Sequence, residues 1–379
     1  MAKSLSNIIP ITATEISITS IDSYFRNIAL IYEFESEDTD PNIKSEKTFS
    51  SDGYEVYETI DAVAEIFEET SLVYKWAADA FAQKVNSGVN GSTFEKLIVI
   101  QKLSTDATYE AALNRVDYKD AYWNLPITDT VAEVQSVYAW VGTKYMRMLT
   151  QDDSANILDS GDSTDIASVL KAATATRASV WYHASQTEGL VSAMAAILST
   201  SNPGDKAAFY KTPSGITVDS SLTSTQETTL EGKYANYFST LQGTAGTYNS
   251  DSLTFNGVGS DNEKIQKGVQ TDRIVLTLQS RGMDVLKRDI PYDNRGASEL
   301  EGELKNVLEG FQVNEIIKEQ FFENREGDLV NGFWVNVVDL ETTRTGYPDQ
   351  YAAQTFVVQI DYLLALTAEK ITIDIEFST

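Results

Sequence analysis

KITIDIEFST, at residues 370–379, carries the clearest fold signal in this sequence. Apolar and polar side chains alternate along it without interruption, which is the pattern of a β-strand with one buried face. The apolar positions are Ile371, Ile373, Ile375 and Phe377. Chain termini usually fray unless something holds them in place. The pattern therefore predicts a terminal strand that joins a sheet.

A second strand-forming stretch lies near the other end, at residues 8–21 (IIPITATEISITSI). Its apolar positions change phase across Thr14 and Glu15, which predicts a bulge or two short strands. The positions assigned to this arm are Ile9, Ile11, Ile16 and Ile18. The chain thus has a strand-forming segment at each end, and the pattern alone leaves open which sheet each one joins.

Composition excludes several classes of protein. The chain has 379 residues, with 29 basic and 56 acidic side chains, and a formal charge of −27. Such an acidic surface repels phosphate backbones and anionic membranes, so we expect no nucleic-acid partner and no direct membrane insertion. The absence of cysteine excludes disulfides and thiolate metal sites. No signal-peptide pattern or long apolar run is present, which predicts a soluble protein.

Between residues 23 and 262, short apolar runs alternate with segments of helical periodicity. This alternation predicts an α/β body with a mixed, partly parallel sheet and flanking helices. Residues 263–366 begin with a long helical pattern and then turn to strands, which predicts a smaller α+β C-terminal domain. Residues 1–22 and 367–379 remain as extended N- and C-terminal β arms.

Glycine, serine and threonine crowd residues 199–229 and 243–260. These residue types favour turns over regular structure. We therefore expect exposed loops in both segments, a short strand at Lys206–Lys211, and a hairpin over Gly246–Gly257.

Catalytic and metal-binding patterns are weak. His183 is the only histidine in the sequence, and in a strand beside Trp181 and Tyr182 we expect it to be a buried, hydrogen-bonded structural residue. The acidic run at residues 152–165 lacks the spacing of a calcium-binding loop, and Asp162 and Asp165 suit a helix N-terminus instead. We predict no catalytic residues, no metal site, no cofactor and no enzymatic activity.

Several stretches, taken in order, resemble the contractile-tail sheath proteins of bacteriophages, in the branch long catalogued as a family of unknown function. The stretches are SNIIPITATEIS (6–17), YETIDAVAEIFEETSLVYKWAADAFAQ (57–83), AYWNLPIT (121–128), DIASVLKAATATRASVWYH (165–183), TPSGITVDSSLTSTQETTLEGKYANYF (212–238) and IPYDNRGASELEGELKNVLEGF (290–311). Asn294 stands where the family more often has Asp, and the sequence after Phe311 matches poorly.

This resemblance implies a structural subunit of the virion tail, made in the host cytoplasm. Sheath subunits form stacked rings, of six copies each, around a tail tube, and contraction drives the tube into the host envelope. The partners implied are further copies of the chain, the tail tube protein, and baseplate and tail terminator proteins. Terminal arms add strands to the sheets of neighbouring subunits, so Ile9, Ile11, Ile16, Ile18, Ile371, Ile373, Ile375 and Phe377 are predicted to be inter-subunit strand residues. We also expect that deleting residues 370–379 leaves a folded subunit that cannot assemble.

Two alternatives remain open. One is an acidic carbohydrate-active enzyme or adhesin, because the sequence has enough carboxylates to supply a catalytic pair. The other is a different tail or baseplate structural protein with the same body.

Overall fold

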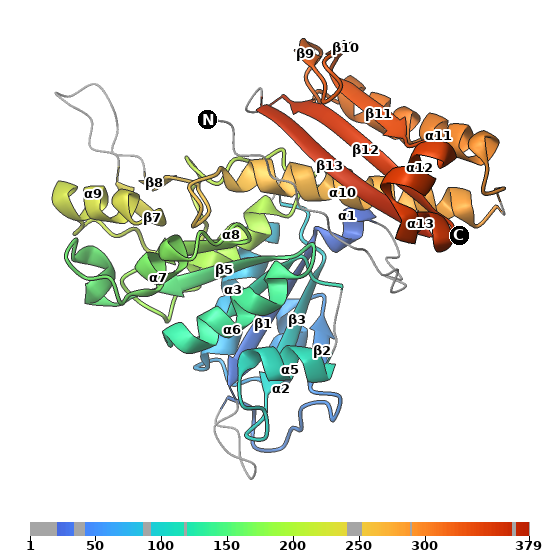
Figure 1. The fold of residues 1–379 in the computed structure, drawn as a ribbon. Coiled ribbons are helices and arrows are strands. Elements are labelled where there is room, and N and C mark those ends of the chain that lie inside the picture. Colours follow the sequence, from blue (N-terminus) through green and yellow to red (C-terminus); the bar gives the residue numbers. More distant parts are fainter. Residues whose placement is uncertain are drawn as a thin grey trace. The chain divides into compact units, whose positions relative to one another are not determined.

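The computed structural model describes seven segments of the chain: residues 21–33, 42–85, 92–116, 120–240, 252–288, 290–365 and 369–378. The predicted N-terminal arm, with Ile9, Ile11, Ile16 and Ile18, lies outside the described residues. The chain divides into two compact units, which we call the body (Ile18–Val269) and the C-terminal unit (from Gln270 onward) (Figure 1). The division falls later than the boundary expected at 262/263.

An eight-stranded mixed sheet forms the centre of the body. The strands are β1 (Asn27–Glu33), β2 (Tyr54–Tyr57), β3 (Lys96–Lys102), β4 (Trp123–Pro126), β5 (Arg147–Asp152), β6 (Ala178–Tyr182), β7 (Ala235–Thr240) and β8 (Ser252–Phe255). Their order in the sheet is β2-β3-β1-β4-β5-β6-β7-β8. The six inner strands are parallel, and β2 and β8 pair antiparallel at the two edges.

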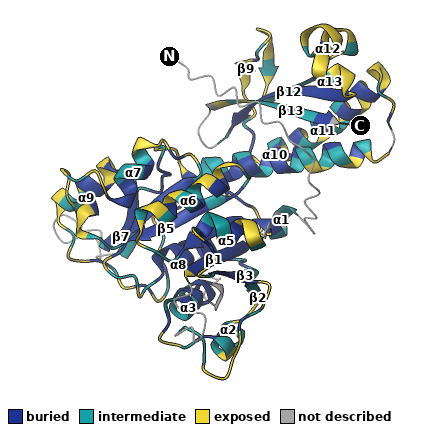
Figure 2. Cartoon of the chain, turned by 60° about the horizontal axis from the view of Figure 1, so that its bottom comes forward, coloured by how far each residue is buried: buried dark blue, intermediate teal, exposed yellow. Residues whose placement is uncertain are grey.

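Short helices connect these strands. They are α1 (Ile21–Tyr24), α2 (Ile60–Ile66), α3 (Leu72–Val85), α5 (Tyr109–Val116), α6 (Val131–Gly142), the 3-10 helix η1 (Ala155–Leu158), α7 (Ile166–Ala172), α8 (Leu190–Leu198) and α9 (Ser224–Gly232). The helices α5, α6 and α7 pack in sequence on one side, whereas α3 and α8 pack against each other. Side chains in the centre of β1 are fully enclosed, with Ile28, Leu30 and Ile31 each 0% exposed. Parallel strands covered on both faces are expected to be apolar in this continuous way, and Figure 2 shows the strands as the most buried part of the body.

The predicted fold class is confirmed: a mixed, partly parallel sheet with flanking helices, followed by smaller antiparallel sheets. Local caps agree with the sequence as well. The Asp165 side chain accepts a hydrogen bond from the Ser168 backbone N–H at the start of α7. Such a cap satisfies one of the unpaired N–H groups of a helix N-terminus.

The Gly/Ser/Thr-rich segments differ from expectation. Lys206–Lys211 is not a strand, and residues 224–229, expected to be loop, form most of α9. The missed signal is a capping box, in which Thr223 and Gln226 bond each other's backbone N–H groups. The first half of the hairpin expected over Gly246–Gly257 lies outside the described residues, and β8 pairs antiparallel with β7.

Four described helices and two antiparallel sheets build the C-terminal unit. The helices are α10 (Ile265–Leu286), which begins in the body, α11 (Asn294–Val313), α12 (Leu340–Gly346) and α13 (Pro348–Ala352). The strands are β9 (Phe321–Glu323), β10 (Leu329–Asn331), β11 (Phe333–Val337), β12 (Thr355–Leu364) and β13 (Glu369–Ser378). β11, β12 and β13 form a three-stranded sheet in that order, while β9 and β10 form a separate hairpin.

One face of this three-stranded sheet packs on α10 and α11. The shared core contains residues that are nearly all below 10% exposure, among them Leu278, Leu304, Phe356, Ile375 and Phe377. Gly282 on α10 allows the Phe377 ring to lie directly against the helix backbone, because a Cβ atom added at this position would lie 2.1 Å from Cε1 of the ring. The absence of a side chain on this helix therefore makes room for the last buried residue of β13.

We predict that Gly282→Ala destabilises the C-terminal unit by about 1–3 kcal/mol, because the added methyl group displaces a buried ring. Gly302→Ala on α11 is the matched control, since nothing lies within 4 Å of its added Cβ. Alanine there should stabilise the helix by up to about 1 kcal/mol. Calorimetric unfolding of both variants measures the difference, and equal effects at the two positions would contradict this packing.

Candidate functional site

The terminal strand β13 pairs with β12 of its own chain along its whole length. The antiparallel register runs from Thr355 opposite Ser378 to Leu364 opposite Glu369. The strand predicted from KITIDIEFST is therefore confirmed. Within the single chain it belongs to the C-terminal sheet, so the separate arm expected at 367–379 is not what the structure describes.

The four apolar residues of β13 face the core, as the alternation predicts. Ile375 and Phe377 are each 2% exposed, and Ile371 and Ile373 pack against the same cluster at intermediate burial. This burial corrects the expectation that residues 370–379 can be deleted from a folded subunit. Their removal would open the core over α10 and α11.

The other edge of β13 has no strand beside it among the described residues. Its orientation follows from β12: the Val338 N–H donates to the Val357 carbonyl, so Val357 directs its backbone groups toward β11. Alternate residues of a strand point their backbone groups in opposite directions. The β12 residues that face β13 are therefore the neighbours of Val357, and by the register their partners in β13 are Ile371, Ile373, Ile375 and Phe377.

It follows that the remaining residues of β13 direct their backbone N–H and C=O groups away from β12. These are Lys370, Thr372, Asp374 and Glu376. Thr372 is exposed, and Asp374 and Glu376 are of intermediate burial. The outer edge of β13 is thus a row of backbone donors and acceptors that can pair with a further strand.

Arg325 links β13 to β12 through ion pairs on the polar face of the sheet. It lies in the turn between β9 and β10, and its guanidinium donates to Asp361 on β12 and to Asp374 on β13. It also reaches the backbone carbonyls of Ile360 and Ile373, at 3.2 and 3.1 Å. Asp361 is 0% exposed, so this arginine supplies the positive charge that a buried carboxylate requires.

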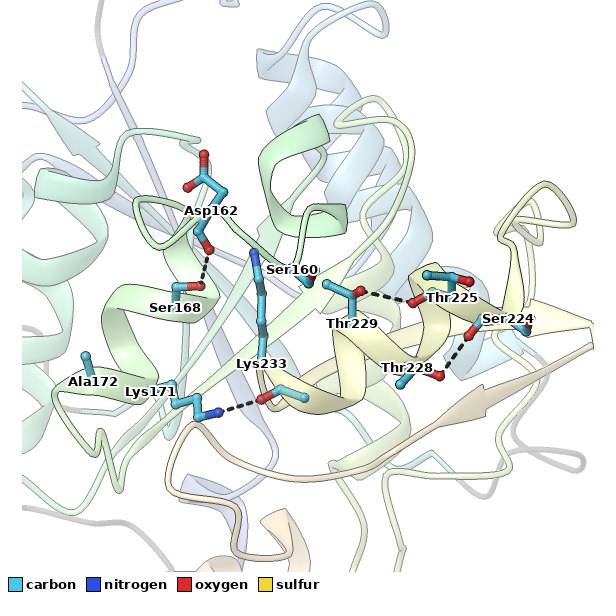
Figure 3. Close-up of a pocket in the computed structure, with 11 residues that line it drawn as sticks. Ser160, Asp162, Ser168, Lys171, Ala172, Ser224, Thr225, Thr228, Thr229 and Lys233 are labelled. Carbon is cyan, nitrogen blue, oxygen red and sulfur yellow. Dashed lines mark hydrogen bonds between the residues drawn. The ribbon is translucent and has the colours of Figure 1, made fainter.

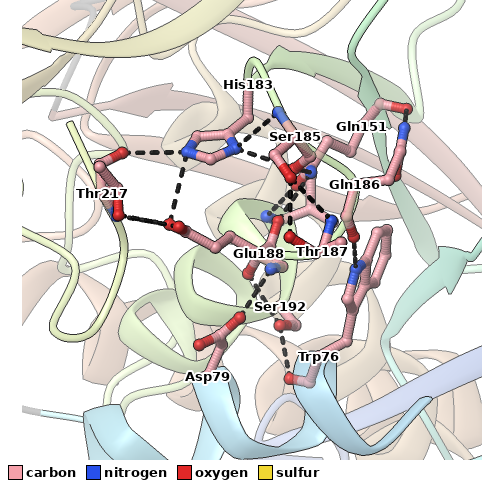
Figure 4. Close-up of polar contacts among 12 residues, drawn as sticks. Trp76, Asp79, Gln151, His183, Ser185, Gln186, Thr187, Glu188, Ser192 and Thr217 are labelled. Carbon is pink, nitrogen blue, oxygen red and sulfur yellow. Dashed lines mark hydrogen bonds and ion pairs between the residues drawn. The ribbon is translucent and has the colours of Figure 1, made fainter. Parts of the chain in front are cut away.

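His183 is buried behind a polar cluster at the carboxyl end of β6 (Figure 4). Its Nδ1 lies 2.9 Å from the Ser185 carbonyl oxygen and its Nε2 lies 3.0 Å from that of Thr217. The Glu188 carboxylate accepts hydrogen bonds from the backbone N–H and the hydroxyl of Thr217. The structure confirms that His183 is buried and hydrogen-bonded. The cluster also holds the loop that carries Thr217 against His183 and Glu188.

Asp79 on α3 belongs to the same cluster and accepts a hydrogen bond from the Gly189 N–H at the start of α8. The pKa of Asp79 is raised to about 6, mainly because partial burial disfavours the charged carboxylate. The nearby Glu188 charge adds to this rise, and the Gly189 hydrogen bond and His183 oppose it. The side chain is thus protonated more readily in the folded chain than in the unfolded chain.

An open groove of about 850 Å³ lies between α7 and α9 (Figure 3). Its two lysines and several of its other polar groups bond within the chain. Lys233 pairs with the buried Asp165 at 2.7 Å, Lys171 donates to the Gly232 carbonyl, and Thr228 donates to the Ser224 carbonyl. These side chains of the groove therefore already have hydrogen-bond or ion-pair partners within the chain.

The seven described segments hold neither a metal-binding cluster nor a membrane-spanning helix. No three His, Asp or Glu side chains in them are grouped so that they could hold a metal ion. No helix in that part of the chain combines the length and apolar character needed to cross a bilayer.

The chain is similar to a protein of known structure. No family model matches the sequence, and no curated protein matches it. The crystal structure of the sheath tail protein from Desulfitobacterium hafniense is similar over 72% of this chain, with 11% identity and a TM-score of 0.48. The match spans 59% of that protein's chain. A likeness of this size does not assign a function.

Three features of the site were not found from the sequence. The charge of Arg325 lies in a turn with several acidic residues, so the sequence gives no sign of its two partners on distant strands. Asp79 lies at a helical position that shows no pattern of its own, and Gly282 reads as an ordinary helix-weakening glycine. Each depends on residues that only the fold brings together.

We predict that Arg325→Met lowers the free energy of unfolding of the C-terminal unit by about 1–3 kcal/mol, because the buried Asp361 loses its closest counter-charge and keeps only Lys370, whose Nζ lies 3.5 Å from the carboxylate. The control Arg344→Met breaks an exposed pair with Glu341 and should change stability by less than about 1 kcal/mol. Urea unfolding followed by hydrogen exchange of the β12–β13 amides measures both. A small effect at Arg325, equal to that at Arg344, would contradict the assigned role.

The pKa of Asp79 gives a second prediction. Because the folded-state value lies above the ordinary value of 3.8, the stability that protonated Asp79 contributes is present at low pH and is lost as pH rises toward and through about 6. Asp79→Asn keeps the acceptor for Gly189 and removes the charge. Thermal unfolding should show the variant more stable than the parent by about 1–3 kcal/mol at pH 7.5, with a smaller gain at pH 4.5. The same gain at both pH values would argue against an ionisable group at this place.

Proposed function

We propose that this chain is the structural subunit of a contractile tail sheath. In this proposal, copies assemble as stacked rings around a tail tube, and their rearrangement drives the tube into the host envelope. The observation that supports it most is the outer edge of β13, a terminal strand held firmly on one side and open to pairing on the other. The ordered sequence stretches that resemble sheath proteins support the same proposal.

Strand addition suits this edge. The outward backbone groups belong to Lys370, Thr372, Asp374 and Glu376. Each added ladder bond contributes about 0.5–1.5 kcal/mol net, and specificity comes from pockets for alternate side chains. Four to five ladder bonds contribute only a modest free energy of association at one contact, but their repetition in every subunit would hold a large assembly together.

The donor in this proposal is the N-terminal stretch of another copy, with Ile9, Ile11, Ile16 and Ile18. Its period-2 pattern is that of a strand with one buried face. The role of β13 changes relative to the sequence-based expectation: Ile371, Ile373, Ile375 and Phe377 hold the acceptor strand in its own sheet, and the edge beside them receives the arm. The burial of Ile375 and Phe377 supports an acceptor over a donated strand.

The remaining partners follow from the proposed role. They are the tail tube inside the rings, and baseplate and terminator proteins at the ends of the tail. The location would be the virion, after synthesis in the host cytoplasm.

Thr372→Pro tests the proposal without disturbing the fold. The Thr372 N–H points away from β12, and proline is tolerated on an edge strand when its missing N–H faces outward. The variant should remain folded but lose the helical tubes or rings that the parent forms in electron micrographs. Thr372→Ala is the matched control, since it retains the N–H and should assemble. Tubes of Thr372→Pro identical to those of the parent would refute pairing at this edge.

A further inference from the structure

A basic and aromatic patch lies beside β8, at one edge of the body sheet. It consists of Lys206, Tyr210 and Lys211, which we call the edge patch. The segment that carries it runs alongside β8: the Tyr210 N–H donates to the Thr254 carbonyl at 2.7 Å, and the Thr254 N–H donates to the Lys211 carbonyl at 2.8 Å. The patch is therefore fixed to the sheet through the backbone.

Tyr210 is an exposed aromatic side chain in a rigid setting. It is 62% exposed, although its ring contacts those of Phe209 and Phe255. Its φ of 55° lies in the left-handed region, which a non-glycine residue occupies only where the surroundings impose it. Preorganised aromatic side chains are enriched at protein interfaces.

The two lysines have no carboxylate partner among the described residues. Burial lowers the pKa of Lys211, and the charge of Lys206 lowers it further. Nearby charges are partly engaged: Lys264 lies over the Phe209 ring, and Glu263 pairs with Lys267, while Asp205 is exposed. In a chain of net charge −27, this leaves a local surplus of positive charge.

The complementary surface is a row of carboxylates on and beside α2, which we call the acidic stripe. Its members are all exposed: Glu58, Asp61, Glu65 and Glu69. None of them forms an ion pair with a described basic residue, and the neighbouring Lys44 donates to the Ala64 carbonyl. Like charges four residues apart, as at Asp61 and Glu65, weaken a helix. Such a row suits a positively charged partner.

The two surfaces lie at opposite edges of one sheet. α2 directly follows β2, the first strand in the order, and the edge patch lies beside β8, the last (Figure 1). Seven intervals of about 4.8 Å separate the outer strands by roughly 34 Å. Different surfaces at opposite ends of a rigid body produce head-to-tail contacts, which close into rings or continue as filaments.

We propose that the edge patch of one copy docks on the acidic stripe of the next copy, as a head-to-tail contact within the assembly. This inference rests on the proposed function, in that copies of the chain must assemble. Charge complementarity between identical chains also accounts for how an acidic protein overcomes its own repulsion on association.

Charge reversal with complementation tests the contact. The first variant is Lys206→Glu/Lys211→Glu, and the second is Asp61→Lys/Glu65→Lys. Each alone places like charges at every contact and should need at least tenfold higher concentration to assemble in sedimentation velocity runs at 50 mM NaCl. An equal mixture should recover assembly, because an alternating order restores opposite charges at both kinds of contact. The control Lys287→Glu/Lys318→Glu changes net charge by the same amount as the first variant and should assemble as the parent does.

The outcomes separate this inference from the proposed function. If both variants assemble like the parent while Thr372→Pro does not, the charged contact is refuted and the sheath proposal stands. If the reversed variants remain folded by circular dichroism, fail alone and also fail as a mixture, the contact is refuted as well. A parent protein that stays monomeric at every concentration contradicts both proposals.

Discussion

Pairing of β12 with β13 is the interaction on which the C-terminal unit depends. It runs the full length of both strands and places Ile375 and Phe377 over the two long helices. Without β13, the sheet keeps two strands, and the apolar face of α10 around Gly282 loses its cover. The same pairing leaves one edge of the sheet open, so stability within the chain and the capacity for assembly come from opposite sides of one strand.

Buried carboxylates are compensated within the chain, whereas the exposed carboxylates of the acidic stripe are not. Asp361 is buried and takes its counter-charge from Arg325, which also reaches β13, so the ion pair orients the strand as well as satisfying the carboxylate. In the body, Asp79 is partly buried near Glu188 and has a raised pKa instead. The exposed carboxylates of the acidic stripe have no such internal compensation, which is why we look for their partner on another copy.

Much of the fold could be predicted from the sequence, because it depends on periodicity. The alternation of KITIDIEFST gave β13 its buried face correctly, and the helix–strand rhythm gave the α/β body. Composition misled in the threonine-rich segment before β7, where the capping box of Thr223 and Gln226 favours a helix that residue content does not suggest. Which sheet β13 joins could not be predicted, since its pattern fits any apolar surface and the register with β12 depends on contacts distant in sequence.

Only part of the candidate site could be predicted from the sequence, because the rest depends on contacts between residues distant in sequence. Ile371, Ile373, Ile375 and Phe377 were identified by their spacing, but their role as anchors of an acceptor strand depends on β12 and α10. Arg325 was missed because its partners are brought to it by the fold.

Hydrogen exchange at single-residue resolution along β13 tests the central claim most directly. The amides of Ile371, Ile373 and Ile375 bond to β12 and should be protected in the free protein, whereas those of Thr372, Asp374 and Glu376 should exchange quickly. In the assembled state, the amides of the second group should become protected as well. Outward amides that still exchange quickly in intact assemblies would contradict the claim that this edge receives a strand.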